Sequence, residues 1–464
     1  MRSYKFEVFT VSIEKNIRKG IYQPGQRLPS VRDLKKMHHL STTTVQHGYE
    51  RLVSQGLVTS VPKKGYYVSE PITDLENTVY PIVRDPIFVN NRFHTTSANL
   101  KRSVSEFNVA APGDLLIPQK LLLRTMQQVI RDKSAGLLRY YDSNGLQDLK
   151  HKIINHAAIY RTIISPDELL ITDGALQALY IALSSVCETN DVIAIESPCV
   201  FSVLEVARVL KLKVIEIPFT TKIGFDFDFL RKACLKNNVK ALVITPNFHN
   251  PTGAMMTDEE KQSLLSIAQK HGLIVIENDI YGDLPFNGER PSTIRSFDES
   301  GSVMTYSSYA KTLAPGVRLG WLSTAHFMHR AEQIKFALGS TVSPIYQETV
   351  HRLLSNASYQ RHIRSFRAQL AKNAQFTIDL LNECFPRGTQ ISDPKGGYNL
   401  WVKLPKHIDV DLFYRKCEET GIRFTPGDTF SFSIAFENHF RIVFSDKYSS
   451  KKIEAIKSIG KYIH

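Results

Sequence analysis

Six short apolar runs between residues 168 and 307 constrain the fold of this chain most strongly. Most are separated from the next by an amphipathic stretch of helical length. Continuous apolar runs, in place of in-and-out alternation, are typical of parallel strands covered by helices on both faces. They predict an α/β domain with a mainly parallel sheet; the runs are ELLIT (168–172), VIAIE (192–196), KVIEI (213–217), ALVIT (241–245), LIVIE (273–277) and VMTYS (303–307).

Composition excludes several classes of protein. A chain of 464 residues is long enough for two or three domains. No apolar run approaches the roughly 18 residues that a membrane helix needs, and the first ten residues, MRSYKFEVFT, contain no apolar signal core. We therefore expect a cytoplasmic protein without membrane contact. The five scattered cysteines, none in C-x-x-C spacing, predict neither a disulfide framework nor a zinc site.

The positive charge is concentrated at the amino terminus. Residues 1–70 contain twelve Lys and Arg against five Asp and Glu, which is about half of the net charge of +13 in 15% of the chain. Such an asymmetry favours a polyanionic partner for this segment.

The pattern of residues 1–70 predicts a winged helix-turn-helix. Apolar residues at spacings of three and four indicate a first helix that ends at Gly20, and Ser30 and Ser41 are suited to cap two more. The β-prone runs GLVTSV and YYVS follow, joined by a turn at residues 62–65. This order presents the third helix to the major groove of DNA. A three-helix protein-interaction module is the alternative, and the basic excess favours DNA.

Three stretches of this segment, PGQRLPSVRDL, STTTVQHGYERLVSQGLV and KKGYYV, resemble the GntR class of bacterial winged-helix regulators. The class usually has arginine where this chain has Thr42, so we expect a base preference that differs from the common one. The resemblance implies binding to double-stranded DNA through Arg32, Thr43, Thr44, Gln46, Lys64 and Gly65.

Residues 71–104 are predicted to be a linker. They show no sustained period and contain Pro71, Pro81 and Pro86. Scattered apolar residues such as Ile82 suggest that the linker docks on a surface. Residues 105–464 then form the large domain.

Reactive side chains follow the predicted strands of the large domain. Ligands bind at the carboxyl ends of strands in such sheets. A turn at Gly174 opens a helix with free backbone amides after the first run; the later runs are followed by Asn250, by Asp279 and Tyr281, and by Ser308, Lys311 and Arg318.

Together these groups suit pyridoxal 5'-phosphate, although any one of them alone is weak evidence. Lys311 can form a Schiff base if burial lowers its pKa, whereas a single lysine is more often an ordinary surface residue. Asp279 is predicted to keep the pyridine nitrogen protonated, and Tyr281 and Asn250 to hold the ring hydroxyl. The predicted phosphate ligands are Ser308, Arg318 and the backbone amides after Gly174, those of Ala175 and Leu176.

The same set, with YYDSNGLQDLK, GGYNLWVKLP, FTPGDTF and FRIVFS, resembles the fold-type I aminotransferases over residues 105–464. The resemblance implies a large domain with a smaller C-terminal α+β subdomain. It also implies a homodimer in which Tyr140 reaches the phosphate of the partner's site, and a substrate carboxylate held by Arg441 with Asn250.

Two departures from that family bear on chemistry. Ala175 stands where a hydroxyl residue is common, so it offers only its backbone amide. Val200 stands where an aromatic ring often stacks on the cofactor, and Phe201 is the candidate to replace it. We expect cofactor binding with inefficient turnover.

A GntR module joined to a fold-type I aminotransferase domain is the architecture of MocR-type regulators. The resemblance implies a transcriptional regulator that senses an amino acid or amine by aldimine exchange at Lys311 and binds repeated half-sites. Three alternatives stay open: an active aminotransferase with a DNA-binding module, a regulator of vitamin B6 metabolism that responds to pyridoxal phosphate itself, and an architectural protein with a vestigial site.

Overall fold

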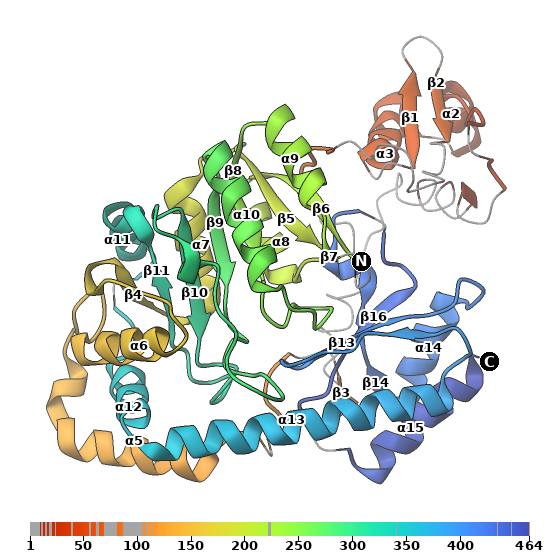
Figure 1. The fold of residues 1–464 in the computed structure, drawn as a ribbon. Helices are drawn as coiled ribbons and strands as arrows, with labels where there is room; N and C mark the ends of the chain where they lie inside the picture. Colours follow the sequence, from red (N-terminus) through yellow and green to blue (C-terminus); the bar gives the residue numbers. More distant parts are fainter. Residues whose placement is uncertain are drawn as a thin grey trace. The chain divides into compact units, whose positions relative to one another are not determined.

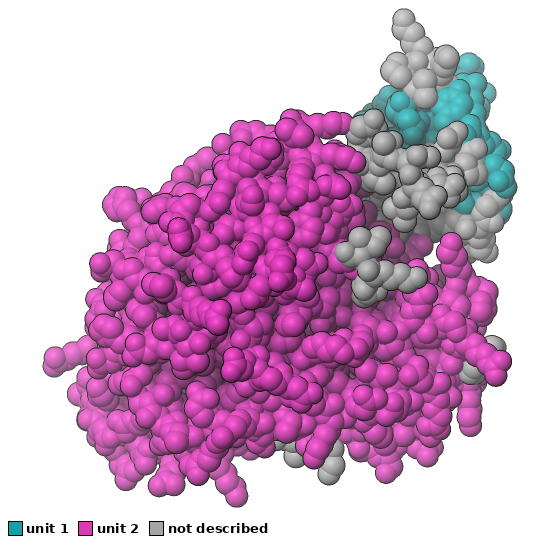
Figure 2. All heavy atoms as spheres, in the orientation of Figure 1, with its two compact units in different colours: residues 1–79 teal, residues 80–464 magenta. Residues whose placement is uncertain are grey.

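The chain forms two compact units, residues 1–79 and residues 80–464, which Figure 2 colours separately. The predicted domain boundaries at 70/71 and 104/105 fall at or beside stretches that are not described, so they stay predictions. The computed structural model describes residues 10, 13, 16–17, 21–23, 25–38, 40–54, 57–61, 65–68, 81–86, 105–107, 110–114, 116–220, 224–339, 341–433, 435–446 and 448–463.

Within the described residues of the first unit, two complete helices and a hairpin lie in the predicted order, and residues 10, 13, 16 and 17 of the predicted first helix are helical. Helices α2 (Val31–His38) and α3 (Thr42–Ser54) are followed by the antiparallel strands β1 (Val58–Val61) and β2 (Gly65–Val68). The Ser41 hydroxyl accepts a hydrogen bond from the Thr44 amide at 3.1 Å, as expected of a helix cap. The core of the unit consists of Ile13, Leu28, Leu34, Leu40, Val45, Tyr49, Leu52, Val58 and Val68.

An eight-stranded sheet forms the centre of the second unit (Figure 1). Its strand order is β4-β11-β10-β9-β8-β5-β6-β7. The five strands from β10 to β6 are mutually parallel, while β11 and β7 are antiparallel to their neighbours. The strands are β4 (Leu169–Thr172), β5 (Val192–Ser197), β6 (Lys213–Thr220), β7 (Gly224–Phe225), β8 (Val239–Ile244), β9 (Ile274–Asn278), β10 (Val303–Ser308) and β11 (Gly320–Ser323).

Helices cover both faces of this sheet, as the continuous apolar strands predict. One face packs against α7 and α8, and the opposite face against α9 and α10. None of the helices in the described ranges is long and apolar enough to span a membrane. The helices of this domain are α5 (Gln119–Lys133), α6 (Gln147–Ile159), α7 (Gly174–Val186), α8 (Phe201–Val209), α9 (Phe227–Lys236), α10 (Asp258–His271), α11 (Met328–Ala337) and α12 (Pro344–Leu354).

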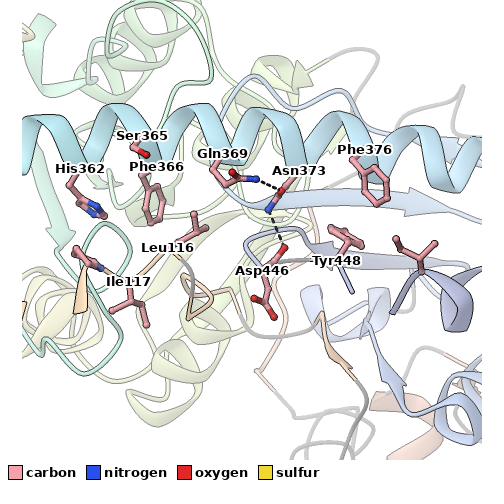
Figure 3. A pocket seen from close by; sticks show the side chains of 12 residues that line it. Leu116, Ile117, His362, Ser365, Phe366, Gln369, Asn373, Phe376, Asp446 and Tyr448 are labelled. Carbon is pink, nitrogen blue, oxygen red and sulfur yellow. Dashed lines mark hydrogen bonds between the residues drawn. The ribbon is translucent and has the colours of Figure 1, made fainter. Parts of the chain in front are cut away.

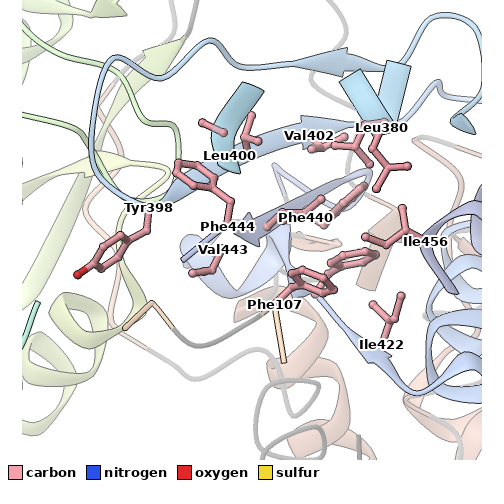
Figure 4. Close-up of a cluster of buried hydrophobic side chains, with 14 of the residues drawn as sticks. Phe107, Leu380, Tyr398, Leu400, Val402, Ile422, Phe440, Val443, Phe444 and Ile456 are labelled. Atoms are coloured by element: carbon pink, nitrogen blue, oxygen red, sulfur yellow. The ribbon is translucent and has the colours of Figure 1, made fainter. Parts of the chain in front are cut away.

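A smaller α+β subdomain follows the long helix α13 (Ala357–Cys384), which extends beneath both parts of the unit in Figure 1. Its antiparallel sheet has the order β12-β13-β16-β15. Figure 4 shows the core between this sheet and the helices, where Phe440 and Val402 meet Leu380 and Ile456. Its elements are β12 (Gln390–Ile391), β13 (Asn399–Lys403), α14 (Val410–Thr420), β14 (Ile422–Arg423), which pairs with β3 (Ser105–Glu106), β15 (Thr425–Pro426), β16 (His439–Val443) and α15 (Ser450–Tyr462).

Residues 81–86 of the predicted linker dock on strand β6. Arg84 and Val214 exchange two backbone hydrogen bonds of 2.8 and 2.9 Å, and Val83 packs against the apolar cluster beneath. Ile82, which we expected to dock, is half exposed instead. The rest of the linker lies outside the described residues.

Candidate functional site

Lys311 lies in the turn that follows β10, with its amine buried. The amine donates a hydrogen bond to the carbonyl oxygen of Ala110, and no carboxylate forms an ion pair with it in the part of the chain that the structure describes. Burial lowers the pKa of Lys311 to about 8, and the positive charges of Arg441 and Arg318 contribute to this shift. A substantial fraction of the amine is therefore neutral, and hence nucleophilic, near physiological pH.

The start of helix α7 lies beside Arg318, one of the two cations near Lys311. Gly174 has a positive φ of 78°, and a Cβ there would come within 2.7 Å of the Arg318 guanidinium. Arg318 donates a hydrogen bond to the Asp173 carbonyl at 3.1 Å, and its side chain is half exposed. The Asp173 side chain does not cap the helix, so a guanidinium and helix-terminal amides meet at a glycine. This arrangement suits a phosphate.

Arg441, on β16, is the second guanidinium near Lys311. It is completely buried, and it donates hydrogen bonds to Asn250 Oδ1 at 2.9 Å and to Thr425 Oγ1 at 3.0 Å. Asn250 in turn donates to the Tyr281 hydroxyl at 3.4 Å. Burial lowers the pKa of Arg441 to about 10, so the group stays charged at neutral pH. A buried guanidinium that is held in place by the neutral side chains of Asn250 and Thr425 suits an anionic ligand group.

Asp279 is not part of this cluster. Its carboxylate forms an ion pair with Arg290 and accepts a hydrogen bond from Asn247 at 3.4 Å. Burial raises the pKa of Asp279, and the Arg290 guanidinium opposes that effect. Arg290 also binds Asp283 at 2.6 Å, and its Cζ lies 3.4 Å from the centroid of the Tyr160 ring. The predicted contact of Asp279 with a pyridine nitrogen therefore does not follow from this geometry.

The other predicted cofactor ligands lie on several different elements. The Ser308 hydroxyl donates to the Leu319 carbonyl at 3.0 Å, next to Arg318. Phe201 begins α8, and the Cζ of Arg441 lies 5.9 Å from its ring centroid. Ala175 and Leu176 form the first turn of α7. Tyr140 is 91% exposed, so within one chain it reaches none of these groups.

A separate pocket of about 580 Å³ lies between α13 and the loops at residues 116–118 and 446–448 (Figure 3). Asn373 donates hydrogen bonds there to the carbonyl oxygens of Phe444 and Asp446 at 2.9 and 3.1 Å. None of the predicted cofactor ligands lines it. Although this pocket is large, it is therefore separate from the candidate cofactor site.

In the first unit, most of the predicted DNA contacts are accessible. Arg32 on α2, and Thr43 and Gln46 on α3, are exposed. Thr44 is half-buried, and its hydroxyl is hydrogen-bonded to that of Ser41 at 2.7 Å. Gly65 opens β2 with a φ of 110°, a conformation that favours glycine. Lys64 lies outside the described residues.

Comparison with known proteins identifies the families of both parts of the chain. Residues 111–458 match the family model described as aminotransferase class I and II. The chain belongs to that family. Residues 10–68 match the model of bacterial regulatory proteins of the gntR family, so the chain combines the two domains of a MocR-type transcriptional regulator, as the sequence motifs predicted.

Two relatives from Escherichia coli K12, named as the uncharacterized HTH-type transcriptional regulators YjiR and YdcR, are each 30% identical to this chain, and each alignment covers 99% of both proteins. Among solved structures, kynurenine aminotransferase of Pyrococcus horikoshii superimposes with a TM-score of 0.75 at 23% identity, over 81% of this chain and 95% of that one. LysN of Thermus thermophilus, complexed with N-(5'-phosphopyridoxyl)-L-leucine, gives 0.73 at 23% identity, over 80% and 94%. These structures confirm the predicted fold.

Sequence patterns missed several residues of the site. Thr425 and Phe430 both contact the Arg441 guanidinium, the second through a ring 5.2 Å away. Both fall inside the FTPGDTF stretch, so the motif marks the segment without indicating which side chains face inward. Arg290 follows no pattern at all, because its role depends on two acids that the fold brings to it.

Proposed function

We propose that this regulator binds pyridoxal 5'-phosphate at Lys311 and uses it to sense an amino acid or a related amine. The observation that carries the proposal is a buried Lys311 amine that donates to the Ala110 carbonyl and lies near enough to Arg318 and Arg441 for their charges to lower its pKa. An aldehyde condenses only with a neutral amine. Of the two cations, Arg318 is suited to the phosphate of the cofactor and Arg441 to the carboxylate of the sensed ligand.

The residues of the chain fit the cofactor at each of these points. Arg318 and the amides at the start of α7 are suited to hold the phosphate, and Asn250 and Tyr281 to hold the ring hydroxyl. When bound, pyridoxal phosphate supplies an aldehyde that condenses reversibly with amines. Arg441 then selects ligands that bear a carboxylate and orients them toward Lys311.

The proposed regulator acts as a homodimer on repeated half-sites of double-stranded DNA. Tyr140 and Leu138 support a dimer. Both side chains are about 90% exposed in the single chain, and neighbouring exposed apolar and aromatic side chains are typical of a surface that a partner covers. In a dimer Tyr140 is expected to reach the partner's phosphate site. Two winged helices held by one dimer favour two half-sites at a fixed spacing.

Three measurements on the full-length protein test this proposal. Addition of pyridoxal phosphate followed by borohydride should add the mass of one reduced cofactor per chain, and peptide mapping should place it on Lys311. Amino acids should then change the absorbance of the bound cofactor, and they should also change the affinity for a DNA fragment from upstream of the gene. Lys311→Ala should lose both responses while it keeps basal DNA binding; unaltered cofactor attachment in this variant would exclude Lys311.

An active aminotransferase is the second candidate, since Lys311, Arg318 and Arg441 are all in place. A relative from Saccharolobus solfataricus named as an uncharacterized aminotransferase is 27% identical over 75% of this chain. Steady transamination between an amino acid and a keto acid, with turnover as fast as the ligand binds, would favour this candidate. Binding without turnover favours the sensor.

A further inference from the structure

Two adjacent residues at the end of β9, Asn278 and Asp279, lie on opposite faces of the sheet. Asn278 is paired in register with Tyr306, and Ile276 with Met304. Ile276, Met304 and Tyr306 all belong to the apolar cluster that packs on α7. Because side chains alternate along a strand, Asn278 lies on this α7 face.

The opposite face is occupied by different groups. Val275 and Val303 pack in the cluster that includes Leu264 of α10. Glu277, on the same face, accepts hydrogen bonds from the Ile294 amide at 2.7 Å and from Thr305 at 3.0 Å. Asp279 continues this alternation, and its partner Arg290 reaches it from that side.

Asp279 is committed to its ion pair. Turning its carboxylate toward the α7 face would leave the buried Arg290 with one acid in place of two, in a site where Tyr160 covers the guanidinium. Loss of a partner from a buried ion pair is strongly unfavourable. Arg290 therefore holds Asp279 away from the groups that converge on Lys311.

Asn278, in contrast, lies on the α7 face. It is 94% buried, its amide donates to Thr245 Oγ1 at 3.4 Å, and its Oδ1 accepts a hydrogen bond from the Ile280 amide at 3.3 Å. The start of α7 lies on the same face. Strand β10, which leads to Lys311, is the neighbouring strand.

We propose that Asn278, and not Asp279, faces the pyridine nitrogen of the bound cofactor, so that this nitrogen stays unprotonated. The inference rests on the proposed binding of pyridoxal phosphate. An amide can donate a hydrogen bond to a neutral ring nitrogen, but it carries no negative charge to stabilise a pyridinium. A carboxylate at this point raises the pKa of an adjacent base by 1–3 units, roughly a 10- to 1000-fold gain in the protonated form.

An unprotonated ring is a weak electron sink. Exchange of one amine for another at the aldehyde does not require that sink, whereas removal of the Cα proton of an amino acid does. Asn278 therefore supports reversible ligand exchange and disfavours transamination, which is the balance that a sensor needs. The assignment of Asn278 therefore favours the sensor over the active aminotransferase.

The test uses full-length protein loaded with pyridoxal phosphate labelled with ¹⁵N in the ring, whose chemical shift separates a neutral pyridine from a pyridinium. We expect a neutral nitrogen in the wild type. Asn278→Asp should convert it to pyridinium and accelerate conversion of the cofactor to pyridoxamine phosphate by an amino acid roughly 10- to 1000-fold. Asn278→Ala should leave the nitrogen neutral.

The matched control changes the neighbouring residue. Asp279→Asn, combined with Arg290→Met so that the guanidinium is not left with one acid and Asp283 keeps His156 as its partner, should leave the nitrogen signal at the wild-type position. A pyridinium in the wild type that this double variant abolishes would overturn the inference, as would a neutral nitrogen that persists in Asn278→Asp. Attachment of the cofactor to Lys311 is measured separately by mass, so absence of that attachment refutes the proposed function and not the assignment of Asn278.

Discussion

Replacement of Arg290 by methionine tests the buried ion-pair network that holds Asp279. Arg290 is the shared cation of Asp279 and Asp283, and its side chain is 9% exposed. Methionine fills most of the volume of the arginine side chain but leaves two buried carboxylates without it. His156, 2.9 Å from Asp283, still compensates part of the charge.

The expected loss of stability is large. Removing one partner of a buried ion pair costs about 3–5 kcal/mol, which lowers the folding equilibrium constant by roughly two to four powers of ten. Removing both charges together is close to neutral. The triple variant with Asp279→Asn, Asp283→Asn and Arg290→Met should therefore recover most of the loss.

The loss should also depend on pH. In the wild type, burial raises the pKa of Asp283, but His156 and Arg290 outweigh it and hold that pKa well below its usual range. Burial already raises the pKa of Asp279 in the wild type, and loss of the opposing Arg290 charge raises it further above its value in the unfolded chain. Such a group favours the folded state below its unfolded pKa, and this contribution is lost as the pH rises through the folded pKa. The deficit of the variant should be smaller at pH 5 than at pH 8.

Urea unfolding followed by tryptophan fluorescence measures this, because both tryptophans, Trp321 and Trp401, are buried in the second unit. Wild type, single and triple variants are compared at both pH values. Equal stability of wild type and Arg290→Met, or a triple variant as unstable as the single one, would refute the reasoning.

Three further predictions concern the ligand and DNA sites. The rate at which pyridoxal phosphate attaches to Lys311, measured by mass spectrometry, should rise from pH 6 to about 8 and then level off. The reason is that a pKa of about 8 gives about 300-fold more neutral amine at pH 7 than the ordinary value of 10.5 does. A rate that keeps rising to pH 10 would contradict the buried environment assigned to Lys311. Arg441→Leu should weaken binding of amino acids about 10- to 100-fold in absorbance titrations, since a charge-assisted hydrogen bond contributes about 1.5–3 kcal/mol. The matching decarboxylated amines should bind as they do to the wild type. Equal losses of affinity for both would argue against a carboxylate contact. Arg32→Ala should weaken operator binding and reduce the salt dependence by about one released ion in fluorescence anisotropy; an unchanged slope would mean that Arg32 contacts no phosphate.

The parallel strands were predictable because each one is a fully buried apolar run, and all six predicted runs coincide with strands to within three residues. The antiparallel strand β11 (Gly320–Ser323) was not predicted, since four residues that include glycine give no period to recognise. The winged helix-turn-helix was predictable for another reason: its caps at Ser30 and Ser41 are local signals.

The positions of Lys311 and Arg318 were predictable because each follows from where a strand ends, and their roles stay predictions. The face of the sheet on which Asp279 lies was not predictable. An error of one residue in where a strand ends exchanges the two faces of the sheet, and sequence cannot resolve a single residue at a strand terminus. Partners such as Arg290, which lies 11 residues after Asp279 in an irregular segment, decide the outcome.

The docked segment at residues 81–86 shortens the covalent connection between the two units. Because Arg84 is fixed to β6, the stretch that separates them runs from residue 69 to about residue 80 and not to residue 104. Twelve residues measure at most about 40 Å when fully extended. With so short a connection, a displacement of one unit constrains the position of the other, whereas a flexible linker of more than thirty residues would leave the two units independent.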